Sequence, residues 1–178
     1  MKKCFICGVL LSTAMGHAAA QDWSVQPVIG MKAQFGGDPL ATIYYTDGTE
    51  QDLLAGQGID FYAGVLLKQS PYSVKASLGY KYSSSMATNI DVAKTALPFN
   101  LTGRYDISSG FFVGGGLTHH FSPQLAIDTD TYTYESSLGY HLELGWEAIS
   151  IGWTSVTYDE SGAEFDASTF DVNLELVF

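Results

Sequence analysis

Residues 169–178 read Thr-Phe-Asp-Val-Asn-Leu-Glu-Leu-Val-Phe and alternate between polar and apolar side chains almost to the last position. Asp171, Asn173 and Glu175 fall on one face of an extended chain, and the apolar residues from Phe170 to Phe178 fall on the other. Successive side chains of a strand point to opposite sides, so this pattern predicts a β-strand with one polar and one apolar face. A strand that keeps the pattern up to a terminal aromatic residue favours a closed transmembrane barrel, whose last strand pairs with its first.

Seven earlier segments share the alternation, so the sequence predicts eight strands. Their bounds are 23–35, 59–68, 72–82, 97–105, 111–118, 132–144, 149–154 and 169–178. The predicted connections alternate in length: those around 70–71, 108–110 and 146–148 are tight, and the others are longer, the longest being 36–54. Short turns at one end and long loops at the other are typical of barrels with periplasmic turns and extracellular loops. The predicted fold is all-β: an eight-stranded antiparallel up-and-down transmembrane β-barrel.

Alternation alone does not show which face points inward, because a soluble barrel of the lipocalin kind, or a sandwich, has the same period with its apolar face inside. The positions of the strand glycines favour a membrane barrel, because small residues relieve crowding in the narrow lumen of eight strands. Most strand glycines fall on the polar face: Gly30, Gly64, Gly79, Gly114, Gly116, Gly139 and Gly152. Aromatic residues gather at both ends of the apolar face, as interfacial girdles do. The periplasmic set is Trp23, Tyr72, Tyr105, Phe111, Trp146 and Phe178, and the outer set is Phe35, Phe61, Tyr80, Tyr82, Tyr132, Tyr134 and Phe170.

The first twenty residues have the three parts of a secretory signal peptide. Lys2 and Lys3 are basic, residues 4–15 are mostly apolar, and Ala18–Ala20 offers a cleavage site. We therefore expect residues 1–20 to be a signal peptide for export through the Sec pathway, and residues 21–178 to be the barrel domain. Both cysteines lie in the expected signal, so the barrel would contain no thiol or disulfide.

Composition excludes several classes of function. Residues 21–178 carry six basic and nineteen acidic side chains, a formal charge of −13. This balance argues against binding nucleic acid, whose phosphates require Lys and Arg. After the expected signal there is no apolar run long enough for a membrane-spanning helix. The sequence shows no phosphate-binding loop, nucleotide signature or His/Cys metal spacing, so we expect no cofactor.

Strand parity sends ten titratable residues into the predicted lumen: Lys32, Asp60, Lys75, Lys81, Arg104, Glu135, His141, Glu143, Asp171 and Glu175. Charges in a narrow interior have to be paired. Near the outer end, we expect Lys32 to meet Asp171 and Asp60 to meet Lys81. Near the periplasm, we expect Lys75 and Arg104 to face Glu143 and Glu175. These pairs would plug the lumen, and the alternative is a polar, porin-like pore lined by the same charges.

The predicted outer loops are acidic. They contain Asp38, Asp47, Glu50, Asp52, Asp91, Asp128, Asp130, Asp159, Glu160, Glu164 and Asp166, and only Lys94 opposes them. A solvated rim that resists aggregation is the simpler interpretation. The more specific hypothesis is that Asp128 and Asp130 bind a divalent cation weakly, although the Gly and Glu of an EF-hand loop are absent.

One cluster has the residue types of an active site. His120, Ser122 and Glu135 share strand parity on neighbouring predicted strands, and a His, a Ser and a carboxylate are the parts of a hydrolytic triad. The spacing resembles that of the outer-membrane lipid A deacylases. Pro-Gln-Leu follows Ser122 where those enzymes have Asn-Ala, and parity points the cluster inward, away from an arriving acyl chain.

Taken as a whole, residues 21–178 resemble the small eight-stranded outer-membrane barrels, such as the transmembrane domain of OmpA, OmpX and OmpW-like proteins. The resemblance lies in the architecture and in the terminal Phe178, which is similar to the signal for the outer-membrane assembly machinery. It implies a monomer in the outer membrane of a Gram-negative envelope, surrounded by the bilayer and lipopolysaccharide. It implies a structural or surface-interaction role without enzymatic activity. The alternatives are a narrow channel or conduit for small or hydrophobic molecules, and lipid A modification.

Overall fold

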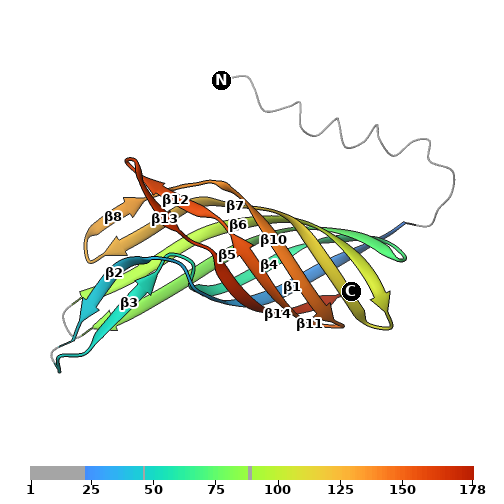
Figure 1. Ribbon diagram of the computed structural model, residues 1–178, viewed down its shortest axis with the longest axis horizontal. Coiled ribbons are helices and arrows are strands. Elements are labelled where there is room, and N and C mark those ends of the chain that lie inside the picture. Colours follow the sequence, from blue (N-terminus) through green and yellow to red (C-terminus); the bar gives the residue numbers. More distant parts are fainter. Residues whose placement is uncertain (1–22, 46, 88–89) are drawn as a thin grey trace, which may run out of the picture.

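The computed structural model describes residues 23–45, 47–87 and 90–178, and every regular element within them is a β-strand (Figure 1). The expected signal peptide and its two cysteines lie outside the described residues. No helix in the described residues is long and apolar enough to cross a bilayer. Eight antiparallel strands form a closed ring: β1 (Ser24–Phe35), β4 (Gly58–Gln69), β5 (Tyr72–Ala87), β6 (Ile90–Ser108), β7 (Phe111–Ile127), β10 (Leu138–Trp146), β11 (Ile149–Ser155) and β14 (Thr169–Val177).

The closing pair joins the two ends of the barrel. β14 runs antiparallel to β1, in register from Val28 opposite Val177 to Phe35 opposite Phe170. Each remaining strand pairs with its neighbour in chain order, and β7 pairs with β10. The tight turns lie where they were predicted, between β4 and β5, between β6 and β7, and between β10 and β11. The predicted up-and-down barrel is therefore confirmed.

The apolar side chains of the barrel strands lie on the outside of the barrel. Phe170, Phe35 and Phe61 are 71%, 62% and 58% exposed, and the outward Val, Leu and Ile residues of the ring are also exposed. The inward face is mostly polar and buried, with lysine, arginine and carboxylate side chains among it. A soluble barrel or sandwich would place these two faces the other way round. The exterior is a belt for lipid, and the barrel is a transmembrane one.

The outer end is more ordered than the sequence predicted. β5, β6 and β7 continue beyond the apolar belt, and the loops add six short strands: β2 (Pro39–Tyr44), β3 (Glu50–Leu54), β8 (Asp130–Thr133), β9 (Glu135–Ser136), β12 (Thr157–Glu160) and β13 (Ala163–Asp166). β2 pairs with β3, β8 extends the β7 hairpin, and β9, β12 and β13 form a small sheet. We call these six strands, with the outer ends of β5–β7, the outer cap.

A separate hydrophobic core holds the outer cap together. Its buried residues are Ile43, Leu53, Ala55, Val92, Leu125, Tyr134, Val156, Tyr158 and Ala167. Tyr134 was predicted in the lipid-facing girdle, and this was wrong: the side chain is 5% exposed and packs against Tyr158 and Phe165. The prediction failed because the segment 132–144 is not one strand but three, β8, β9 and β10, so its facing changes along the way.

Glycines on the inner face make room for side chains of the neighbouring strands. A Cβ added at Gly114 would lie 2.8 Å from Glu143 Cγ, and one at Gly152 would lie 2.7 Å from Asp171 Oδ1. At Gly116 the obstacle is backbone, because an added Cβ would overlap the Leu101 carbonyl oxygen. By contrast, an added Cβ at the outward Gly103 meets nothing closer than 3.8 Å.

Gly116 and Gly103 provide a matched test of the inward and outward faces of the barrel. Gly116→Ala should lower the free energy of unfolding by about 1–3 kcal/mol, since backbone has to move to accept the methyl group. Gly103→Ala should change it by less than about 0.5 kcal/mol, as expected for an open position. Urea titration of the folded barrel in lipid vesicles, followed by gel migration with and without boiling, measures both. Equal losses would contradict the assigned facing of β6 and β7.

Candidate functional site: the charged lumen and its two ends

Four charged side chains from four strands meet in the half of the lumen nearest the tight turns. Lys75 on β5, Arg104 on β6, Glu143 on β10 and Glu175 on β14 are each at most 7% exposed. Lys75 Nζ lies 2.7 Å from Glu175 Oε2 and 3.7 Å from Glu143 Oε2. Arg104 bridges both carboxylates, with Nη2 donating to Glu175 Oε2 at 3.0 Å and Nε donating to Glu143. We call these four residues the inner ion cluster; its two positive and two negative charges balance.

Neighbouring polar and aromatic groups hold the cluster in place. The Tyr62 hydroxyl lies 2.8 Å from both Glu175 Oε2 and Asn173 Oδ1. His141 Nε2 lies 3.5 Å from Glu143 Oε2, and its Nδ1 lies 2.9 Å from the Thr154 hydroxyl. The Arg104 guanidinium lies over the Phe112 ring, 4.5 Å from its centroid. Because each carboxylate has several donors, the cluster meets the condition under which buried charges are tolerated.

The outer charges are arranged differently from the expected pairs. Lys32, Asp60, Lys81 and Asp171 are all buried, but no nitrogen–oxygen distance of ion-pair length joins them in the described structure. Lys81 lies directly opposite Asp60 in the strand register, yet its Nζ donates to the Gly56 carbonyl instead. Asp60 Oδ1 is buried without a hydrogen-bond partner in the described residues. The expected Asp60–Lys81 pair is not formed.

The strand register also separates Lys32 from Asp171. Lys32 faces Asn173 on β14, and Asp171 faces Gln34 on β1, so the two expected partners are one pleat apart. The Asp171 carboxylate instead lies against Gly152 and within 3.5 Å of the Thr154 hydroxyl. The expected pair fails because alternation predicts which face a residue occupies but not the stagger between strands.

Lys94 is part of this outer arrangement rather than of the solvated rim. It lies beyond the apolar belt, 2% exposed, and its Nζ donates to the carbonyls of Leu54 and Ala55 at 2.5 and 2.7 Å. Together Lys81 and Lys94 thus hold three consecutive carbonyls, of residues 54–56, over the outer end of the lumen. Burial, together with the charge of Lys81, lowers the pKa of Lys94 to about 6.

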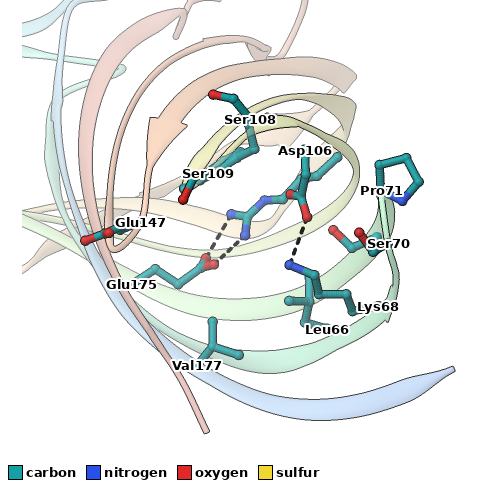
Figure 2. Close-up of a pocket in the computed structure, with 14 residues that line it drawn as sticks. Leu66, Lys68, Ser70, Pro71, Asp106, Ser108, Ser109, Glu147, Glu175 and Val177 are labelled. Carbon is teal, nitrogen blue, oxygen red and sulfur yellow. Dashed lines mark hydrogen bonds and ion pairs between the residues drawn. The ribbon is translucent and has the colours of Figure 1, made fainter. Parts of the chain in front are cut away.

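A polar cavity opens at the opposite end, beneath the inner ion cluster (Figure 2). Its volume is about 500 Å³, and the three tight turns contribute to its rim. Glu175 and the guanidinium of Arg104 form its base, and a Lys68–Asp106 ion pair of 2.9 Å lies on one wall. Its apolar lining residues are Leu66, Pro71, Phe112 and Val177.

The three residues of the candidate triad border one surface pocket but are not joined to one another. His120 is 2% exposed, and its Nδ1 lies 2.5 Å from the Tyr158 hydroxyl. Ser122 is exposed in a bulged segment with φ of 46°, and Glu135 is exposed on β9. No hydrogen bond links His120, Ser122 and Glu135, so the described structure does not assemble a triad. Glu135 also does not enter the lumen as predicted, because the strand is interrupted at the buried Tyr134 and Glu135 begins the separate strand β9.

The candidate cation ligands form a turn instead of a site. Asp128 has φ of 51°, its Oδ1 accepts from the Asp91 N–H at 3.2 Å, and its own N–H donates to the Asp91 carbonyl at 3.0 Å. Asp130 begins β8 and is exposed. The part of the chain that the structure describes contains no group of three or more His, Cys, Asp or Glu side chains placed to hold a metal ion.

Comparison with known proteins returned neither a matching family model nor a matching curated protein. Among solved structures, the chain is similar to Ail, the attachment invasion locus protein of Yersinia pestis, in complex with the heparin analogue sucrose octasulfate. Identity is 12% over 87% of this chain and 99% of that one, with a TM-score of 0.48. A second Ail structure gives 10% identity over 85% and 97%, with a TM-score of 0.44. Neisserial surface protein A gives 8% identity over 86% and 96%, also with a TM-score of 0.44.

The inner ion cluster can be tested by unbalancing it. Arg104→Met should lower the free energy of unfolding by about 3–5 kcal/mol, because it leaves two buried carboxylates against a single lysine. The control removes all four charges at once, with Lys75→Met, Arg104→Met, Glu143→Gln and Glu175→Gln. This variant should recover much of the loss, since replacing a whole buried network by neutral groups is often tolerated. An Arg104→Met barrel as resistant to urea as the wild type would rule the cluster out as a stabilising element.

The buried Lys94 should make the stability of the outer cap depend on pH. Its pKa is lower in the folded cap than in the unfolded chain, so folding releases a proton and stability rises from about pH 6 towards pH 10. The slope should be at most about 1.4 kcal/mol per pH unit. Lys94→Met should remove this dependence, because the variant has no amine to titrate at this position. Limited proteolysis of the cap across this pH range measures the effect, and a wild-type cap that loses stability on going from pH 7 to 9 would contradict it.

Proposed function

We propose that this protein is an outer-membrane surface protein whose barrel anchors an acidic, folded cap outside the cell, and that its lumen is closed to solutes. The proposal has two parts. The barrel supplies a rigid and sealed anchor, and the cap supplies a surface of one sign of charge for interaction. The observation that carries it is the charge distribution: acidic and basic side chains are buried together in the lumen, whereas the exposed charged side chains of the described cap are all acidic.

Closure of the lumen is supported at two depths. The inner ion cluster brings side chains from four strands together across the barrel, and an interior of eight strands is narrow enough for side chains to fill. Farther out, Lys81 and Lys94 hold the carbonyls of residues 54–56 over the lumen. A solute would have to break both sets of contacts to pass.

The cap surface is acidic throughout. Its exposed carboxylates are Asp38, Asp47, Glu50, Asp52, Asp91, Asp128, Asp130, Glu135, Glu164 and Asp166, and Asp159 and Glu160 are half-buried. No lysine or arginine is exposed in the described part of the cap, because Lys94 is buried. Such a surface attracts cationic partners and repels polyanions. We infer that the cap interacts with a basic protein or peptide surface, and not with a sulfated polysaccharide.

Binding of a polycation and of a polyanion to the cap tests this function. Vesicles that present the cap outward should bind polylysine in a salt-sensitive manner and should not bind heparin. Neutralising two cap acids with Glu50→Gln and Asp130→Asn should weaken polylysine binding severalfold, by an amount of about 1 kcal/mol. The control is Asp106→Asn with Glu147→Gln, which removes the same charge at the other end and should leave binding unchanged. Equal loss in both variants, or heparin binding by the wild type, would contradict a cap-specific role.

A further inference from the structure

The periplasmic cavity is a built site that closure of the lumen does not explain (Figure 2). Its volume of about 500 Å³ lies within the range of pockets for small molecules. Two of its charged residues are deeply buried, Arg104 at 7% and Glu175 at 6% exposed, so the base is fixed by the inner ion cluster. The rim is fixed as well, because the Glu147 N–H donates to the Gly110 carbonyl at 2.7 Å and ties two of the turns together.

The cavity is lined by three carboxylates and two cationic side chains, so one carboxylate has no cationic partner. Arg104 is bound to Glu175 at the base, and Lys68 is bound to Asp106 on one wall, 2.9 Å apart. Glu147 on the opposite wall has no ion-pair partner among the described residues. In Figure 2 its carboxylate lies on the far side of the cavity from Lys68 and Asp106. The rim of the cavity therefore carries one exposed carboxylate that has no ion-pair partner among the described residues.

Hydroxyl groups make up most of the remaining polar lining. Ser70, Ser73, Ser108 and Ser109 all line the cavity, and none of their hydroxyls makes a hydrogen bond to another described residue. Ser73 is 4% exposed and lies deep, whereas the other three lie at the rim. Each hydroxyl can donate and accept, so together they suit a molecule with several hydroxyl groups of its own.

We propose that this cavity binds a small polyhydroxylated amine from the periplasm, an amino sugar in chemical class. Its ammonium group pairs with Glu147, and its hydroxyl-bearing frame contacts the serines. An anionic ligand is disfavoured because three carboxylates line the cavity against two cations that are already paired. An apolar ligand is disfavoured because it would leave the serine hydroxyls and Glu147 without partners. The proposal is independent of the role of the outer cap, which lies at the other end of the barrel.

Three probes that share one disaccharide frame separate the contribution of the amine from that of the sugar frame. They are the disaccharide of glucosamine with both amines free, its N,N′-diacetylated form, and cellobiose. Titration into the full chain in nanodiscs, with both faces accessible, should show the free amine binding about tenfold more tightly than either neutral probe. Equal binding of all three, or no binding of the free amine, would overturn the proposal.

A pair of variants separates the cavity from general attraction to an acidic protein. Glu147→Gln keeps the size of the side chain and should weaken binding of the free amine by about tenfold. Glu164→Gln removes the same charge from the cap and should leave binding unchanged. Both variants should keep the gel migration of the folded barrel, since both side chains are exposed. If the two variants bind alike, the amine is held by overall charge and the assignment to this cavity is wrong.

Discussion

Charge pairing inside a narrow barrel is the constraint on which the rest of the structure depends. Eight strands enclose little space for hydrated side chains, so a charge buried in the lumen is costly unless an opposite charge or other polar groups stabilise it. The inner ion cluster meets this need with Lys75, Arg104, Glu143 and Glu175, drawn from strands that are far apart in the sequence. The glycines of the inner face follow from the same constraint, because Gly114 leaves the space that Glu143 occupies. The cluster therefore links strand closure and packing to the proposed closure of the lumen.

In the outer half of the barrel, buried lysines are stabilised by a different kind of partner. Lys81 and Lys94 use backbone carbonyls of residues 54–56 instead of carboxylates, and these carbonyls are in place only because the first outer loop folds back over the barrel. The hydrophobic core of the cap holds that loop. Lys81 and Lys94 are thereby buried, and the exposed charged side chains of the described cap are all acidic. The interior and the surface chemistry of this protein are two consequences of one distribution of charge.

Much of the fold could be predicted from the sequence because barrel strands have a two-residue period. The alternation of residues 169–178, and of seven segments like it, predicted the strands, the tight turns and the direction of both faces. The cap could not be predicted this way, since Ile43, Val92 and Leu125 pack across three different loops, and no periodicity relates them. The same limit applies to Lys94, which was placed on the rim because it falls in the predicted loop between strands 72–82 and 97–105.

For the candidate sites too, strand parity predicted which face a residue occupies but not which residues it contacts. Parity was enough to place Lys75, Arg104, Glu143 and Glu175 on the inward face, and the structure brings them within contact distance. Lys32 and Asp171 required the stagger between β1 and β14, which depends on cross-strand packing. His120 illustrates a further difficulty: it has the residue neighbours of a catalytic base, but Tyr158, far along the chain, is its hydrogen-bond partner.

Single-channel recording in planar bilayers measures closure of the lumen most directly. The purified full chain, inserted alongside an open porin as a control for detection, should show no discrete openings at neutral pH if the inner ion cluster and the carbonyls held by Lys81 and Lys94 close the lumen as proposed. Regular openings of defined conductance in the wild-type protein would show that the lumen conducts and would contradict the proposed closure.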